Sequence, residues 1–82
     1  MERIYHARRL VERKEKGVQG LQKTLLRMME DNINCTRTED SLFIQEELED
    51  SYMLWQIYLD KLADMKDLFQ EVASQVREFM DS

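Results

Sequence analysis

The feature that most constrains this chain is a spacing of four and three residues that runs unbroken through its second half. The positions are Ile44, Leu48, Ser51, Trp55, Tyr58, Leu62, Met65, Phe69, Val72, Val76 and Phe79. All of them except Ser51 are apolar or aromatic. A 4-3 spacing keeps side chains on one side of an α-helix, whereas a strand needs a period of two. The spacing therefore predicts one long helix over residues 39–80 with a coiled-coil-like seam.

The first half of the chain repeats this spacing and is interrupted only by one charged residue. Its positions are Ile4, Ala7, Val11, Lys14, Val18, Leu21, Leu25 and Met28. Leu10, Leu26 and Met29 widen the apolar stripe beyond the width of a simple two-stranded seam, which is typical of a helix in a bundle. This pattern predicts a helix over residues 2–33.

Gly17 and Gly20 are the weak point of that first helix. Each glycine in a helix interior costs about 1 kcal/mol relative to alanine, so a break here, giving three helices, is the alternative. We favour a continuous helix because the apolar spacing keeps its phase across both glycines. One register would also place Leu21 opposite Trp55, so that the glycines make room for the bulkiest residues of the second helix.

The segment between the two patterns, residues 34–38, is a short turn with helix-capping signals. Thr36 and Glu39 have the spacing of a capping box, and Thr38 is an alternative cap directly before two acidic residues. Helices joined by so short a connection must be antiparallel neighbours. The predicted fold is an all-α antiparallel hairpin, with residues 1–82 forming a single domain and the lone Cys35 lying in or beside the turn.

A hairpin of this size has too little interior to cover all of its apolar residues. We therefore expect a homodimer, a four-helix bundle, although a different helical protein partner would use the same surfaces. The second helix is also predicted to outrun the first, leaving its last apolar residues without a partner in the hairpin. The predicted interface residues are Met53, Leu54, Ile57, Leu59, Val72, Val76, Phe79 and Met80.

Charge is divided unequally along the chain. Residues 1–37 hold nine Lys and Arg against five Asp and Glu, whereas residues 38–82 hold three against twelve. A basic stripe on the first helix is predicted to point outward: Arg9, Arg13, Lys16, Lys23 and Arg27. A dimeric nucleic-acid-binding bundle using this stripe is one alternative function. We consider it less favoured, because the matching acidic stripe on the second helix would repel a phosphate backbone.

Signals for catalysis or metal binding are weak. His6 is the only histidine and Cys35 the only cysteine, so we expect no metal, no cofactor and no catalytic residues. A small helical-bundle enzyme remains an alternative, because Arg8, Arg13 and Lys14 resemble the basic groups with which chorismate mutases grip a dianion. Residues 45–49 also resemble the Ser-Gln-Glu-Leu-Asp box of small helical-hairpin phosphatases, but without its serine. Neither similarity extends far enough to identify a family.

These observations favour a non-enzymatic protein–protein interaction module. We expect a small helical adaptor, regulator or chaperone that presents its second helix to a partner. The chain contains no run of apolar residues long enough for a membrane span, and we expect a cytoplasmic protein.

Overall fold

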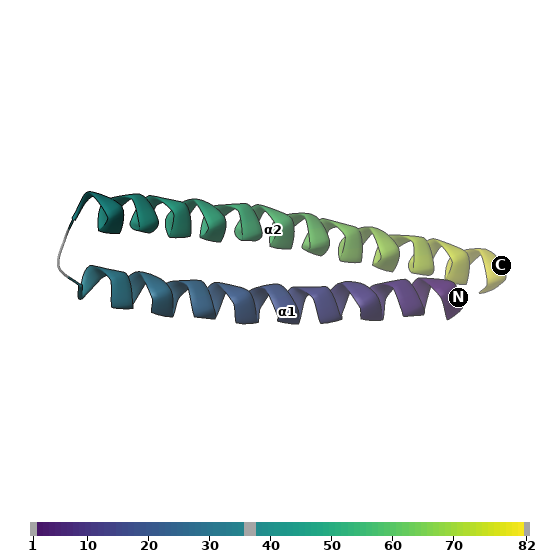
Figure 1. Ribbon diagram of the computed structural model, residues 1–82. Helices are drawn as coiled ribbons and strands as arrows, with labels where there is room; N and C mark the ends of the chain where they lie inside the picture. The colour runs from purple at the N-terminus through teal and green to yellow at the C-terminus, as the bar shows by residue number, and fades with distance from the viewer. Residues whose placement is uncertain (1, 36–37, 82) are drawn as a thin grey trace.

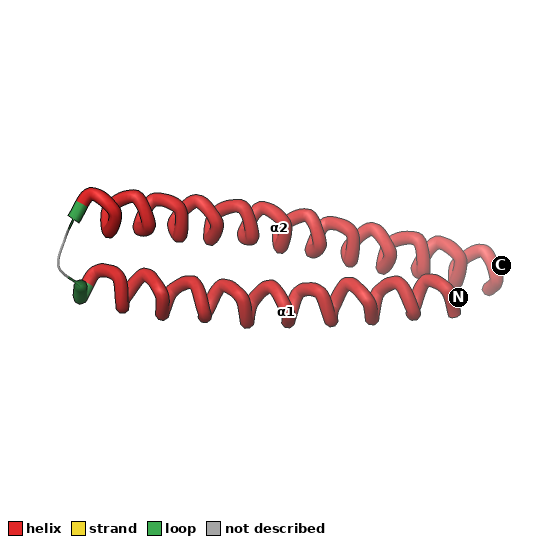
Figure 2. Tube along the Cα trace, viewed as in Figure 1, coloured by secondary structure: helices red, strands yellow, loops and turns green. Residues whose placement is uncertain are grey.

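The computed structural model describes residues 2–35 and 38–81, which form two long helices lying side by side (Figure 1). Helix α1 spans Glu2–Ile33 and helix α2 spans Glu39–Asp81. The pair is an elongated antiparallel hairpin measuring 67 × 15 × 13 Å along its principal axes. No strand occurs among the described residues (Figure 2). The predicted all-α antiparallel hairpin is confirmed, with helix ends at or next to the predicted residues.

Helix α1 continues without a break through both of its glycines. The prediction of one continuous helix is therefore confirmed, and the three-helix alternative is wrong. A Cβ atom added to Gly17 or Gly20 would meet nothing within 4 Å. The glycines thus do not make room for bulky residues of α2, and the suggested packing role inside the hairpin is wrong.

Thr38 caps the start of α2. Its Oγ1 accepts a hydrogen bond from the backbone N–H of Ser41 at 3.2 Å, and its carbonyl oxygen accepts one from the N–H of Leu42 at 3.0 Å. These bonds satisfy N–H groups that have no partner within the helix. The other predicted cap, Thr36 in a capping box with Glu39, lies outside the described residues.

The end of α1 is tied to the start of α2 through Asn32. Its side-chain Nδ2 donates to the carbonyl oxygen of Ser41 at 2.9 Å and to Oε1 of Gln45 at 3.0 Å. One amide therefore links the last turn of α1 to the first two turns of α2. This link holds the antiparallel pairing at the turn end of the hairpin.

The helices contact one another along a single line of buried and half-buried residues, which we call the inner seam. In α1 it comprises Ile4, Arg8, Val11, Glu15, Val18, Gln22, Leu25, Met29 and Asn32. In α2 it comprises Ser41, Gln45, Leu48, Tyr52, Trp55, Leu59, Leu62, Lys66, Phe69, Ala73 and Val76. Both lists keep the 4-3 spacing of a coiled coil. The most buried apolar members include Val11, Val18 and Leu62, each 5% exposed.

The inner seam differs from the predicted seam at every second position. In α1 the predicted Lys14, Leu21 and Met28 are exposed, and the neighbouring Glu15, Gln22 and Met29 face α2 instead. In α2 the predicted Ile44, Tyr58, Met65 and Val72 are exposed in the same way. Each helix is thus rotated about its own axis, relative to the prediction, by about half of the angle between successive residues. An apolar stripe wider than one seam permits two rotations, and periodicity alone does not choose between them.

Candidate protein-interaction face

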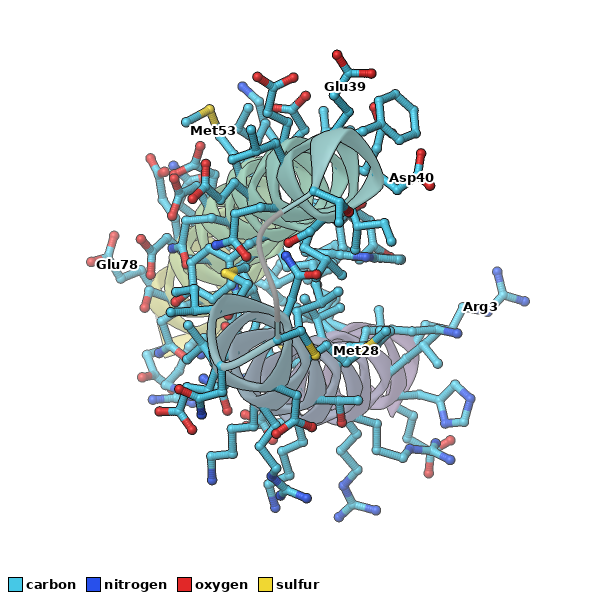
Figure 3. The ribbon with its side chains drawn as sticks, turned by 60° about the vertical axis from the view of Figure 1, so that its left-hand side comes forward. Arg3, Met28, Glu39, Asp40, Met53 and Glu78 are labelled. Atoms are coloured by element: carbon cyan, nitrogen blue, oxygen red, sulfur yellow. The ribbon has the colours of Figure 1, made fainter. Side chains whose placement is uncertain are left out.

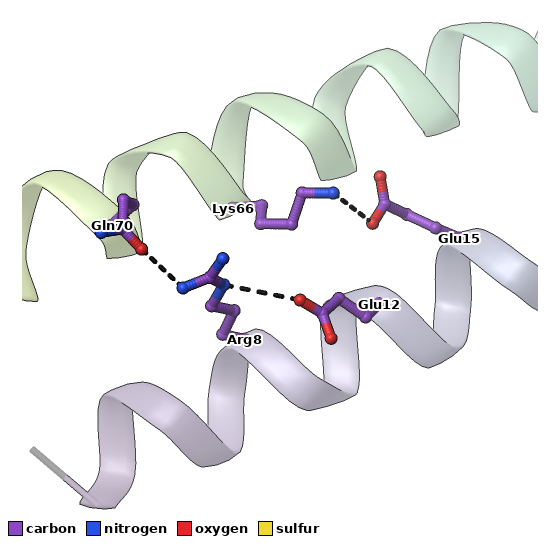
Figure 4. A network of polar contacts seen from close by, with 5 residues as sticks. All are labelled: Arg8, Glu12, Glu15, Lys66 and Gln70. Atoms are coloured by element: carbon purple, nitrogen blue, oxygen red, sulfur yellow. Dashed lines mark hydrogen bonds and ion pairs between the residues drawn. The ribbon is translucent and has the colours of Figure 1, made fainter.

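Polar side chains in and beside the inner seam bond to one another across the two helices. Gln22 Nε2 donates to Gln56 Oε1 at 3.0 Å, and Lys66 Nζ donates to Glu15 Oε1 at 2.9 Å. Nearer the open end of the hairpin, Arg8 donates to Gln70 and forms an ion pair with Glu12 at 3.5 Å (Figure 4). Polar groups are tolerated in a contact between helices when they have such partners. These pairs let polar residues take seam positions that apolar side chains were expected to fill.

The contact between Lys66 and Glu15 is an ion pair that links the two helices. The hydrogen bond to the Glu15 carboxylate raises the pKa of Lys66 above its ordinary value of 10.5, and the Glu12 and Asp67 charges act in the same direction. Burial opposes this rise, because it disfavours the charged ammonium. Lys66 therefore stays protonated and fixed to α1 throughout the neutral range of pH.

Most of the large apolar side chains that the inner seam leaves exposed lie on one side of the hairpin, which we call the lateral face. Its exposed large apolar residues are Leu10, Leu21, Met28, Ile44, Leu54, Tyr58, Met65, Leu68, Val72 and Phe79. Most stand three residues after an inner-seam position, as Leu21 does after Val18, so they are rotated by about 60° around the helix. The two helices run in opposite directions and face each other. The same rotation of about 60° therefore brings residues of both helices to one side of the hairpin.

A groove on this side of the hairpin is lined by residues of both helices. Leu10, Leu21, Trp55 and Tyr58 line it together with Lys14 and Gly17. The rings of Trp55 and Tyr58 meet edge to face, with centroids 5.7 Å apart and planes at 78°. Trp55 is half-buried, so this pair joins the inner seam to the lateral face.

The opposite side of the hairpin carries a second apolar patch. It is lined by Leu26, Met29, Tyr52 and Met53 and bordered by Glu49 and Gln56. Viewed from the turn end, Met28 and Met53 point to opposite sides of the helix pair (Figure 3). The exposed apolar residues of the lateral face extend along α2 from Ile44 to Phe79.

The exposed area of the chain is large for its mass. The accessible surface is 6791 Å², whereas a compact monomer of 10.0 kDa exposes about 5,200 Å². The difference of about 1,600 Å² exceeds the roughly 800 Å² that each partner buries in a typical stable interface. None of the large side chains in the described part of the chain is fully buried. The hairpin therefore has a small buried core and a large exposed apolar surface.

The predicted interface residues do not form one patch. Val72, Phe79 and Leu54 lie on the lateral face, whereas Met53 lies on the opposite side and Ile57 points away from α1. Met80 is 74% exposed near the end of α2. The remaining two, Leu59 and Val76, are half-buried members of the inner seam.

Helix α1 reaches further along α2 than expected. Arg77 Nη2 donates to the Tyr5 hydroxyl at 3.5 Å, so the start of α1 lies beside the turn of α2 that contains Val76. The expectation that Val76 has no partner within the hairpin is therefore wrong. The apolar positions that the sequence reasoning missed are those of α1, Leu10, Leu21 and Met28. The width of the α1 stripe was the signal for them.

The predicted basic stripe is exposed along its whole length. All of Arg9, Arg13, Lys16, Lys23 and Arg27 are accessible, and long side chains ending in nitrogen project from α1 away from α2 (Figure 3). The acidic residues on the outward side of α2 are exposed as well: Glu46, Asp50, Asp60, Asp64, Asp67, Glu71 and Glu78. The outward surface of α1 is thus basic and the outward surface of α2 is acidic. The lateral face lies between these two surfaces.

The remaining reactive side chains stand apart from one another. His6 is exposed in the first turns of α1, and Cys35 is exposed at the turn, where its Sγ donates to the carbonyl oxygen of Asp31 at 3.2 Å. Among the residues that the structure describes, no three His, Cys, Asp or Glu side chains are grouped as metal ligands would be. Within residues 2–35 and 38–81, neither helix is long and apolar enough to cross a membrane.

No protein-family model, curated protein or solved structure matches this chain.

Proposed function

We propose that this chain is a non-enzymatic protein–protein interaction module that works as a homodimer, with the lateral faces of two hairpins packed together in a four-helix bundle. The observation that carries the proposal is the distribution of side chains between the two sides of each helix. Apolar residues such as Leu21, Tyr58 and Met65 are exposed, while Gln22 and Lys66 occupy the inner seam. Extended apolar surfaces of this kind in soluble proteins are sites of association.

A second hairpin is the occupant that suits this face. A helix in a four-helix bundle contacts two neighbours and so needs two adjacent apolar stripes, whereas a hairpin supplies only one neighbour. The face is long, straight and lined by both helices, which is the shape that another helix pair covers completely. Dimerisation would also bury enough area to offset the thin core of one hairpin.

In this proposal the outer surface of α2 remains accessible after dimerisation. Met53, Ile57 and Met80 lie outside the lateral face, and the acidic residues of α2 surround them. This leaves the dimer with the features of a small helical adaptor, regulator or chaperone, a class that acts by holding partner proteins and not by catalysis.

A matched pair of substitutions tests the proposal. Leu21 and Leu26 are 42% and 47% exposed on the same helix, but only Leu21 lies on the lateral face. Sedimentation equilibrium should show a wild-type dimer, a Leu21→Glu monomer, and a Leu26→Glu dimer. Circular dichroism should show that both variants stay helical. A monomeric wild-type protein, or equal effects of the two substitutions, would contradict the proposal.

Nucleic-acid binding is the second candidate, favoured only by the exposure of the whole basic stripe. Lys16 and Lys23 test it well, because they point away from the lateral face. A gel shift with RNA or DNA at physiological salt that disappears in the Lys16→Glu, Lys23→Glu double variant would establish this alternative. We expect no shift with either protein.

A further inference from the structure

The charges bordering the lateral face indicate how the two copies in the dimer are arranged. This inference rests on the function proposed above. We infer that the two copies dock about a two-fold axis parallel to the helices. In this arrangement α1 of each protomer packs against α2 of the other, and both turns lie at the same end of the bundle. The partner recognised by the lateral face is then a second copy in one defined orientation.

Each helix carries a second line of residues with coiled-coil spacing, adjacent to the inner seam. In α1 this line comprises Arg3, Ala7, Leu10, Lys14, Gly17, Leu21, Thr24, Met28 and Asp31. In α2 it comprises Asp40, Ile44, Glu47, Ser51, Leu54, Tyr58, Lys61, Met65, Leu68, Val72, Gln75 and Phe79. An unbroken 4-3 spacing on a second side is what a helix needs in order to pack against a second helix.

The two edges of the lateral face have opposite charge. On α1, the charged residues on the second line and just beyond it are basic except for one: Arg3, Arg13, Lys14, Arg27 and Asp31. On α2, the corresponding residues are acidic except for one: Asp40, Glu47, Asp50, Lys61, Asp64, Glu71 and Glu78. Arg3 on α1 and Asp40 on α2 both point to the same side as Met28 (Figure 3).

Only two symmetric arrangements bring two such faces together with their helices aligned. A two-fold axis parallel to the helices places the basic edge of one copy against the acidic edge of the other. An axis across the helices stacks α1 on α1 and α2 on α2, so that edges of like charge meet. Like charges placed opposite each other disfavour an interface. The charge pattern therefore selects the parallel axis.

The register of the hairpin matches individual charges in the selected arrangement. The contacts of Gln22 with Gln56 and of Arg8 with Gln70 fix which residues lie at the same height along the two helices. A parallel two-fold axis preserves height. Arg13 therefore lies level with Asp64 of the second copy, and the same reasoning sets Arg27 level with Asp50. Each pair occurs twice in the symmetric dimer.

The lone cysteine distinguishes the two arrangements directly. Cys35 is exposed at the turn, and the hairpin is 67 Å long. Nitroxide labels on the Cys35 thiols of a wild-type dimer should give an electron–electron distance well below half of that length if both turns lie at one end. The crossed arrangement would place the labels near opposite ends, at a distance approaching the full length. Such a long distance would overturn the inference while leaving a dimer, and hence the proposed function, intact.

A charge reversal tests the same inference without labels. Arg13→Glu should raise the dimer dissociation constant on the order of tenfold, because two attractive contacts become repulsive. Adding Asp64→Lys should restore most of the affinity. In the crossed arrangement Arg13→Glu would remove repulsion between two α1 helices and tighten the dimer. A tightened or unchanged dimer would therefore contradict the inference, and a wild-type monomer would contradict both this inference and the proposed function.

Discussion

The inner seam and the lateral face of this hairpin have compositions that are the reverse of those expected for a molecule that works alone. The inner seam holds Gln22, Glu15 and Lys66 in positions that face the other helix, whereas the lateral face exposes Leu21, Tyr58 and Met65. A solitary hairpin would be more stable with those apolar side chains between its helices. The difference indicates that the inner seam sets pairing and register, and that the lateral face supplies the remaining apolar burial through association.

The largest expected effect comes from the apolar core of the inner seam. Leu62 is 5% exposed, and Leu62→Ala should lower the free energy of unfolding by about 3 kcal/mol, because it removes packed methyl groups and leaves a cavity. Urea denaturation followed by circular dichroism measures this loss. The matched control is Leu68→Ala on the lateral face, whose effect should fade when the protein is diluted below its dimer dissociation constant. Equal and concentration-independent losses would erase the distinction between the two regions.

The next effect concerns association and leaves each hairpin folded. Tyr58→Ala should weaken dimerisation by about 2 kcal/mol, roughly thirtyfold, because large aromatic residues near the centre of an interface dominate its energy. Met53→Ala, on the opposite side, is the control and should change the dissociation constant little. Sedimentation equilibrium measures both variants. A larger effect from Met53 would place the interface on the other side of the hairpin.

The hydrogen bond between Gln22 and Gln56 tests how much a polar pair between the two helices contributes to the stability of the hairpin. Gln56→Leu should cost about 1 kcal/mol, because it leaves the buried amide of Gln22 without its partner. Gln22→Leu should cost less, because Gln56 is exposed and still donates to Asp60. The double substitution should be near neutral or stabilising, since both polar groups are then gone. A double-mutant cycle measured by urea denaturation gives the coupling directly. Simple additivity of the two losses would show that the hydrogen bond contributes nothing to stability.

The smallest effect is the dependence of stability on alkaline pH. Contact with Glu15 raises the pKa of Lys66 above 10.5, so the folded state holds this proton more tightly than the unfolded chain does. The contribution is complete below pH 10.5 and is lost as the pH rises through the raised value. Comparison of the wild type with Lys66→Met should show a stability difference that shrinks over this range. Lys61→Met, which removes the same charge outside the inner seam, should show no such change.

The candidate site was only partly predictable from the sequence. Val72, Phe79 and Leu54 were identified as exposed apolar residues of α2, and all three lie on the lateral face. The α1 half of the face was missed because Leu21 and Met28 had been assigned to the contact within the hairpin. Leu59 was placed beside the seam by the same error in helix rotation. Val76 was placed in the seam, and the error there was the expectation that it extends past the end of α1.

The sequence by itself determined the two helices, their ends, the short turn and the antiparallel pairing. These follow from local properties: the 4-3 spacing, the cap at Thr38, and a connection too short for any other arrangement. Only the tertiary structure decided which side of each helix faces the other. Apolar residues occupy two adjacent lines on both helices, and periodicity cannot choose between two lines of equal spacing. Cross-helix bonds such as those of Gln22 and Glu15 accompany the observed rotation, and they depend on the positions of residues far apart in the chain.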